Sequence, residues 1–318
     1  MLLRFVIFSL LALSIINIKM KTSISVMMLA LASFLACSCN NQTKVKKSVE
    51  ADLEVDVRTD TSAQTIKFGN TLFSLPSPYQ LTMMIKNAGA VFNESLLNPI
   101  SNNQNYSTLF KKCVNLGVYG ADLAYLNINS QSALVVNAFS VVKVLATDLD
   151  LLATFSSELV DRVERNIDNK DSLLSIMSNT YRDIDVFLKE SEREKEGTLV
   201  LAGGWVEAMY ILSQMATETK DEVLKLRLGE SKQPLENLIK ILSPYYGESQ
   251  DIAKLVDALI DLSGAYESVE QSYTYSNPEI DAESKVTVIK STTKVVVTDS
   301  DLLSITDKLK AIRMSLVE

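Results

Sequence analysis

Apolar residues recur every three or four positions along most of the chain between about residue 78 and residue 272. One series runs through Leu159, Val163 and Ile167, and a later one through Leu255 and Leu259. This spacing puts the apolar side chains on one face of an α-helix, so it predicts a succession of amphipathic helices. We predict a mainly α fold, an antiparallel bundle or array of about nine or ten helices of roughly 10–20 residues with short connections.

Turn-forming residues divide this helical pattern into segments. Proline at position 78 suits the first turn of the opening helix, which continues through Ala88. Asparagine, glycine and proline disfavour a continuing helix, so we expect breaks where they cluster. The expected breaks are Asn98-Pro99, residues 166–169, Glu196-Gly197 and residues 243–247.

Two short stretches depart from the helical pattern near the C-terminus. Residues 285–290 (KVTVIK) and 293–298 (TKVVVT) are rich in β-branched residues, which suit strands better than helices. We predict a small β-hairpin that turns at Ser291 and Thr292 and lies on the helices or pairs with residues 66–68. A last helix should follow, capped by Asp299 or Ser300. Its apolar stripe is Leu302, Ile305, Leu309, Ile312 and Leu316.

The region before the first helix is extended or polar. Residues 65–76 have extended character, and Gly69-Asn70 reads as a turn between two strands. Residues 40–64 lack a sustained apolar period and contain no aromatic residue, which is typical of a flexible tether. The predicted organisation is therefore a tether over residues 37–64 and a single α-helical domain over residues 65–318.

Two apolar runs, residues 5–18 and 24–36, open the chain. Each is shorter than the roughly 20 residues that a membrane-spanning helix needs. The second run follows Lys21 and ends in small residues, which is the order of a secretory signal peptide. We predict that residues 1–36 are a signal peptide whose true start is Met20; the alternative is an unusually long signal whose working part is still the second run.

Residues 34–39, FLACSC, resemble the lipobox of bacterial lipoproteins. In that motif a cysteine directly after the cleavage point carries fatty acyl chains such as palmitate, which anchor a soluble domain through about 0.8 kcal/mol per buried CH₂. Cys37, which follows Leu35 and Ala36, is the favoured lipidation site, and Cys39 is the alternative. The competing interpretation is an ordinary cleaved signal with two incidental cysteines. The third cysteine, Cys113, is expected to be a buried core thiol.

Composition and charge exclude several classes of function. The 318 residues contain no histidine and carry a formal net charge of −8. Histidine-dependent nucleophile pairs and histidine-ligated metals are therefore excluded, and the acidic balance argues against a nucleic-acid partner. The short run Ala202–Gly204 is too weak for a phosphate-binding loop, and residues 168–171 lack the spacing of a calcium loop. We expect no metal and no cofactor.

Two segments resemble each other and hold the residues with the most chemical potential. Residues 115–125 (NLGVYGADLAY) and 201–210 (LAGGWVEAMY) each carry glycines, an aromatic residue, an acid and a tyrosine three residues after the acid. Glycine costs about 1 kcal/mol in a helix interior, and close helix approach is its commonest reason there. The segments would then be equivalent central helices of an internal duplication. The functional interpretation is a ligand pocket formed by Tyr119, Asp122, Tyr125, Trp205, Glu207 and Tyr210.

These same segments, with the lipobox and residues 75–78 (LPSP), resemble a family of uncharacterised lipoproteins from Bacteroidetes. The resemblance covers most of residues 65–318. It implies a lipid-anchored α-helical domain, and it implies no activity and no catalytic residue.

The sequence thus leads to three hypotheses on function. The first is a binding or scaffold module at the cell envelope, for a partner protein or a small ligand. The second is a hydrolase or lyase that uses Asp122 and Glu207 as an acid/base pair, which requires the two carboxyl groups about 5–10 Å apart in an open cleft. The third is a structural spacer. In each case lipid holds the domain to the membrane, with the outer membrane favoured over the inner one.

Overall fold

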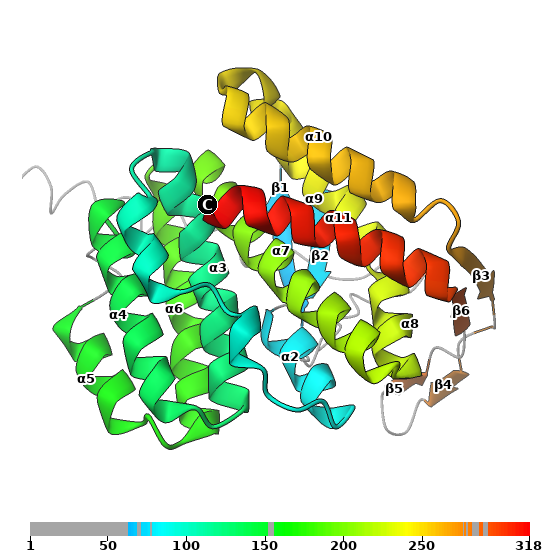
Figure 1. Ribbon diagram of the computed structural model, residues 1–318, viewed down its shortest axis with the longest axis horizontal. Helices are drawn as coiled ribbons and strands as arrows, with labels where there is room; N and C mark the ends of the chain where they lie inside the picture. The colour runs from blue at the N-terminus through cyan, green and yellow to red at the C-terminus, as the bar shows by residue number, and fades with distance from the viewer. Residues whose placement is uncertain are drawn as a thin grey trace, which may run out of the picture. The chain divides into compact units, whose positions relative to one another are not determined.

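Helices dominate the computed structural model, which describes residues 63–68, 71–76, 78–151, 156–275, 277, 279–281, 286–288 and 292–318. The fold is mainly α, as the apolar period predicted (Figure 1). All described residues belong to one compact unit, Val57–Glu318. The predicted signal peptide, both candidate lipidation sites and nearly all of the tether lie outside the described residues.

The described part contains ten α-helices. They are α2 (Pro78–Asn87), α3 (Leu109–Ile128), α4 (Ser132–Asp148), α5 (Ser157–Arg165), α6 (Lys170–Glu190), α7 (Glu194–Thr219), α8 (Glu222–Glu230), α9 (Lys232–Leu242), α10 (Gln250–Ala265) and α11 (Asp299–Val317). Three short 3₁₀ helices join them: η1 (Glu94–Leu96), η2 (Ile100–Asn105) and η3 (Ser243–Glu248).

The core is built around α3 and α7, which pack against each other. Every residue of α3 from Cys113 to Ile128 is buried, and α7 is buried along most of its length. A helix that is apolar on all sides can be stable only when other elements surround it. Here α4 and α11 contact α3, while α8, α9 and α11 contact α7. The prediction of two central helices is therefore confirmed.

The predicted helix breaks are partly confirmed. Asn169 caps α6 through its side chain, which accepts a hydrogen bond from Ser172 N, and η3 covers the predicted break at residues 243–247. The predicted break at Glu196-Gly197 is wrong, because both residues lie in the first turn of α7. Glutamate stabilises that turn through the helix dipole, and Glu196 also pairs with Arg193. The chain turns instead at Glu192, whose φ is 58°.

The segment before α3 also differs from the prediction. The first helix ends at Asn87, followed by Gly89 in the left-handed region (φ 76°), rather than at Asn98-Pro99. Asn98 and Pro99 lie between η1 and η2. The intervening residues 91–106 form no α-helix, and we refer to them as the strap.

The strands form antiparallel pairs. β1 (Ala63–Phe68) pairs with β2 (Thr71–Pro76), with Phe68 opposite Thr71, so the predicted extended character of this region is confirmed. Gly69 and Asn70 lie outside the described residues. β2 contacts α9.

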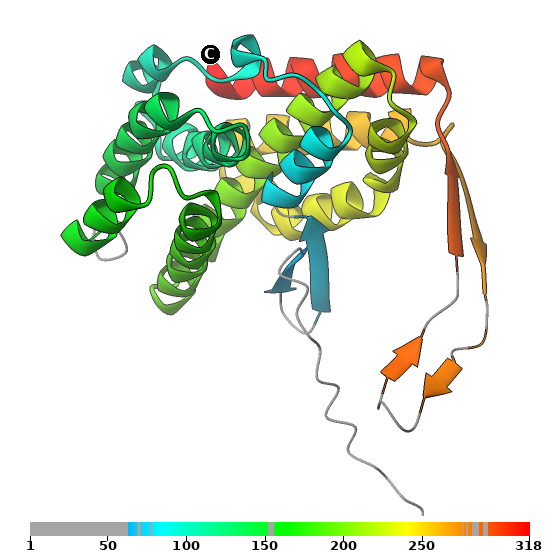
Figure 2. The ribbon, with the colours of Figure 1, turned by 90° about the horizontal axis from the view of Figure 1, so that it is seen from below.

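Near the C-terminus the strands are present, but the predicted pairing is wrong. The two β-branched runs do not pair with each other: β5 (Val286–Val288) pairs with β4 (Glu279–Asp281), and β6 (Thr292–Val296) pairs with β3 (Glu270–Thr274). Both pairs follow one another along a single ribbon (Figure 2). The partners β3 and β4 are polar, so no apolar pattern marked them.

The base of this ribbon is anchored on α8. Val295 and Val297 are buried, and a Cβ at Gly229 of α8 would lie only 2.4 Å from Val297 Cγ2. The side chain of Gln271 donates a hydrogen bond to the Gly229 carbonyl (3.0 Å). The start of α11 corrects a further prediction, because its cap is Thr298 rather than Asp299 or Ser300. Thr298 forms a reciprocal capping box with Asp301.

Candidate functional site

The glycines that the two similar segments share lie at the contact between α3 and α7. A Cβ at Gly117 would lie 1.9 Å from the carbonyl oxygen of Val200, and a Cβ at Gly203 would lie 1.8 Å from that of Val114. Real side chains never approach a backbone oxygen so closely, so only glycine allows the two helices to meet at this distance. The predicted reason for these glycines, close helix approach, is confirmed.

This contact is reciprocal. Gly117 of α3 approaches Val200 of α7, and Gly203 of α7 approaches Val114 of α3. Each residue of α7 here is 86 positions beyond its counterpart in α3. The acids Asp122 and Glu207 are 85 positions apart, one residue fewer. The local relation between the two helices thus has the form of a pseudo-twofold contact, which is what a duplicated helix pair would produce.

The same two helices bring the two acids together in the interior. Asp122 of α3 is 1 % exposed and Glu207 of α7 is 0 % exposed. Burial raises the pKa of both carboxyl groups, and their mutual interaction raises that of Asp122 further. The two acids thus interact electrostatically, as the functional interpretation required. They do so in the interior and not in an open cleft.

Arg313 of α11 neutralises Glu207. Its Nε donates to Glu207 Oε2 (3.0 Å) and its Nη2 donates to Glu207 Oε1 (3.2 Å), which is a two-point ion pair. The guanidinium also lies over the ring of Tyr210, with 5.0 Å between Cζ and the ring centroid. The pair lowers the pKa of Glu207 and so opposes the effect of its burial. Glu207 is therefore the ionised member of the acid pair.

Asp122 has a different environment. Its Oδ2 accepts a hydrogen bond from the backbone N–H of Asn98 in the strap (3.1 Å), whereas its buried Oδ1 accepts none from the described residues. Burial and the neighbouring Glu207 raise its pKa well above the ordinary value. A proton on Oδ1 would supply a donor toward the Glu207 carboxylate and so satisfy this atom. We therefore assign Asp122 as the protonated acid, which leaves the three-residue cluster without net charge.

Two of the three tyrosines of the predicted ligand pocket, Tyr119 and Tyr125, form hydrogen bonds with the strap. Tyr119 donates its hydroxyl to the Pro99 carbonyl (2.8 Å), and the hydroxyl of Tyr125 accepts from the backbone N–H of Asn93 (3.0 Å). Burial raises the pKa of both phenols. Trp205 is buried, and its Nε1 has no hydrogen-bond partner among the described residues. The six predicted residues are all buried, so they line no open pocket.

Sequence reasoning missed several members of this cluster. Arg313 lies four residues after Leu309, so the helical period places it on the buried side of α11, where its side chain is 11 % exposed. A charged residue at such a position is a signal of a buried ion pair. Asn98 and Tyr106 carried no such signal, because the strap has no regular period. Asn98 Nδ2 donates to Tyr106 Oη (2.9 Å), and Tyr106 donates to the Val317 carbonyl (3.2 Å).

The remaining predictions concern Cys113, metal ligands and membrane-spanning helices. Cys113 is fully buried, and burial raises the pKa of its thiol to about 12, so the expectation of an inert core thiol is confirmed. No group of three or more potential metal ligands occurs among the described residues. Within that part of the chain α7 is long and apolar enough to cross a membrane, but 89 % of its apolar window is buried inside the fold, as expected of a core helix.

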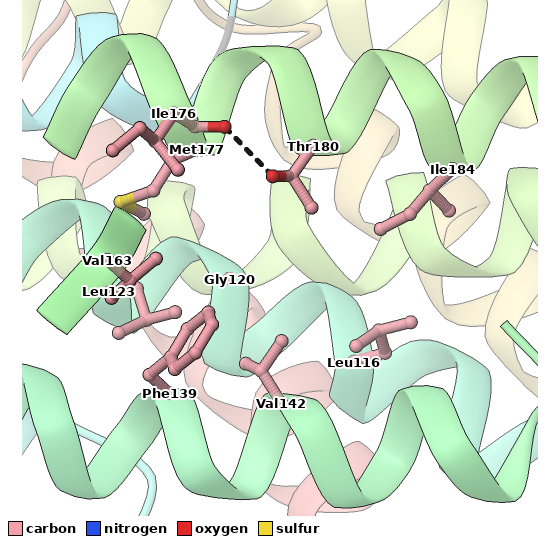
Figure 3. A pocket seen from close by; sticks show the side chains of 10 residues that line it. All are labelled: Leu116, Gly120, Leu123, Phe139, Val142, Val163, Ile176, Met177, Thr180 and Ile184. Carbon is pink, nitrogen blue, oxygen red and sulfur yellow. Dashed lines mark hydrogen bonds between the residues drawn. The ribbon is translucent and has the colours of Figure 1, made fainter. Parts of the chain in front are cut away.

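A separate apolar cavity of about 30 Å³ lies between α3, α4, α5 and α6 (Figure 3). Thr180 supplies the polar atom of its lining, and its hydroxyl already donates to the Ile176 carbonyl (2.9 Å). The lining is Leu116, Gly120, Leu123, Phe139, Val142, Val163, Ile176, Met177, Thr180 and Ile184. None of the six predicted pocket residues contributes to it.

The burial of Asp122 and Glu207 bears on whether they could act as an acid/base pair. Glycosidase-type chemistry requires two carboxyl groups that reach a substrate and a water molecule. Here both acids are enclosed, and one is held by a two-point ion pair. The cluster thus acts as a polar tie between α3, α7, α11 and the strap. Comparison of the chain with protein-family models, curated proteins and solved structures finds no match.

Proposed function

We propose that this chain is a bacterial cell-envelope lipoprotein whose helical part is a binding or scaffold module. The observation that carries the proposal is the order of residues 20–39: a basic start, an apolar run of signal-peptide length, and a cysteine after small residues. Acyl chains on Cys37, or alternatively on Cys39, would hold the domain to a membrane, with the outer membrane favoured. The polar residues that follow would serve as the tether.

A binding role is favoured over a hydrolase role by the state of the two acids. A general acid and a general base must reach the reacting atoms. Asp122 and Glu207 are buried, and Arg313 occupies the carboxylate of Glu207. The residues best suited to carboxylate chemistry are thus engaged in holding the fold, which leaves recognition of an envelope protein or a small ligand as the proposed activity.

Membrane fractionation of cysteine variants tests the anchoring. We expect Cys37→Ser to move the protein from the membrane fraction to the soluble fraction of a bacterial host. If Cys39 is acylated instead, Cys39→Ser will do so and Cys37→Ser will not. Cys113→Ser is the matched control, because a buried core thiol has no role in anchoring and the variant should stay in the membrane fraction. Retention of the Cys37→Ser, Cys39→Ser double variant in the membrane would refute the lipid anchor.

The binding role needs its own test. Native capture of the full-length, detergent-solubilised protein, followed by mass spectrometry of proteins and small molecules, should recover a stoichiometric partner or ligand. The captured species should then bind the purified protein with saturation. A spacer without recognition would yield neither, and that result would replace the binding module with the structural alternative.

A further inference from the structure

The strap, residues 91–106, is held to the core by the hydrophobic side chains of Phe92, Leu96, Leu97 and Tyr106 and by a set of polar contacts. Only Leu96, Asn98 and Tyr106 are buried along its length, and all of its other residues are exposed or half-buried. The strap contacts the C-terminal part of α11, where Tyr106 donates its hydroxyl to the Val317 carbonyl. Because most of the strap is exposed or half-buried, its closed position depends on its polar contacts as well as on these apolar ones.

Two of those polar contacts go directly to the buried charge cluster. The backbone N–H of Asn98 donates to Asp122 Oδ2 (3.1 Å), and Arg313 Nη2 donates to the Leu96 carbonyl (3.2 Å). Asp122 and Arg313 therefore bind two strap residues, Asn98 and Leu96, that are two positions apart. Because these bonds join the strap backbone directly to ionisable side chains, a change in the charge of the cluster changes the strength of the bonds that hold the strap.

The composition of the cluster makes its charge depend on one proton. It contains two carboxyl groups and one guanidinium, and the other titratable groups that face it are the phenols of Tyr106 and Tyr119 from the strap and α3, and of Tyr210 from α7. Phenols are neutral over the ordinary pH range, so they cannot balance a second carboxylate. Because Arg313 pairs with Glu207, the cluster is neutral only while Asp122 holds a proton.

We propose that Asp122, Glu207 and Arg313 form a proton-dependent clasp, which keeps the strap closed over the α3–α7 contact and releases it when Asp122 loses its proton. Ionised Asp122 would stand against the Glu207 carboxylate in a buried place that offers one cation for two negative charges. Lifting the strap admits water to both carboxylates and so relieves their repulsion and their desolvation. The strap is the element that can move, because the other contacts of the acids belong to packed helices.

The pH dependence of this clasp has a definite sign. The open state has an accessible Asp122 with an ordinary pKa near 3.9, whereas the closed state has a raised one. Between these two values the open state binds fewer protons, so the equilibrium shifts toward opening as the pH rises. The open-to-closed ratio grows by up to about tenfold per pH unit in this window and levels off above the pKa of the closed state.

Hydrogen exchange of the full-length protein tests the clasp. After correction for intrinsic rates, protection of the strap amides should fall as the pH rises from about 5, by up to about tenfold per pH unit, and should level off once Asp122 has ionised in the closed state. Protection in α10 should stay unchanged. Asp122→Asn is the matched variant, because its amide can accept from Asn98, donate to Glu207 and never ionise. Its strap should stay protected with no pH step.

Tyr119→Phe separates the clasp from simple loosening. This variant loses the hydroxyl bond to the Pro99 carbonyl but leaves the charge cluster intact. Strap protection should fall by a similar factor at every pH, with the step retained. A wild-type strap whose protection ignores pH, or a step of equal size in Asp122→Asn, would overturn the proposal.

Infrared spectroscopy of the wild type gives a second readout if Asp122→Asn does not fold. A buried protonated carboxyl band should disappear over the pH range in which the strap loses protection. A folded wild-type protein without such a band at the pH where the strap is protected would also overturn the clasp.

Discussion

The α3–α7–α11 contact and the α3–α6 side of the molecule use the same central helix in opposite ways. Toward α7 and α11, α3 presents glycine and polar side chains, so the helices approach within backbone contact and tie themselves with buried charges. Toward α4, α5 and α6 it presents Leu116, Gly120 and Leu123, and a cavity of about 30 Å³ remains there. Hydrogen bonds and ion pairs fix the geometry of the α3–α7–α11 contact, whereas the apolar packing between α3 and α4–α6 tolerates a cavity.

Breaking the charge cluster should have the largest effect. Arg313→Met leaves the Glu207 carboxylate buried without its cation, and we expect a loss of about 3–5 kcal/mol in the free energy of unfolding. Chemical unfolding of the purified protein measures this. The double variant Arg313→Met, Glu207→Met should recover much of the loss, because it removes the unpaired charge. A double variant as unstable as the single one would show that the charge itself is not what matters.

The glycine contact comes next. Gly203→Ala places a methyl group against the Val114 carbonyl, so the helices must separate, and we expect a loss near the upper end of the roughly 1–3 kcal/mol range for overpacking. Gly197→Ala is the matched control in the same helix. Its Cβ would lie 3.6 Å from Leu188 Cδ1, an ordinary contact, so it should stabilise the protein by up to about 1 kcal/mol. Equal effects of the two substitutions on unfolding would contradict the close contact.

The smallest expected effect lies at the cavity. Val142→Ile adds one methylene to the lining, and we expect a gain of up to about 0.8 kcal/mol in the free energy of unfolding. Val118→Ile adds the same group to a fully buried residue of α3 outside that lining, and should cost about 1 kcal/mol. Thermal and chemical unfolding compare the two. A gain at both positions would mean that the two sides of α3 do not differ in packing.

The local period of the sequence was enough to predict the class of fold and the central helices. The three- to four-residue apolar spacing marks α5 and α10, and paired glycines mark the contact of α3 with α7. The predictions failed where a local signal competed with a partner elsewhere. Gly197 reads as a helix break, but the charge of Glu196 and its pairing with Arg193 favour the first turn of α7. The β-branched runs read as each other's partners, but each pairs with a polar strand.

The two acids of the candidate site were predicted, but their burial and their partners Arg313 and Asn98 were not. The likeness of two segments was enough to single out Asp122 and Glu207 as a possible pair, and the two do interact in the interior. It could not show that the strap covers them, because η1 and η2 have no period that a pattern could detect. It also gave no pairing for Arg313, which lies 106 positions beyond Glu207. Long-range ion pairs of this kind depend on the tertiary arrangement and leave little trace in local sequence.

The position of Arg313 along the chain has a consequence for how the protein folds. Its bond to the Leu96 carbonyl joins residues 217 positions apart, and Lys111 donates to the Ser315 carbonyl across 204 positions. Individual helices form in about a microsecond, whereas contacts between such distant segments must first overcome the entropy of closing a long loop. We therefore expect the helices to form early in refolding and the Arg313–Glu207 ion pair to form late. Refolding should then show a slow final phase in which Asp122 and Glu207 become buried.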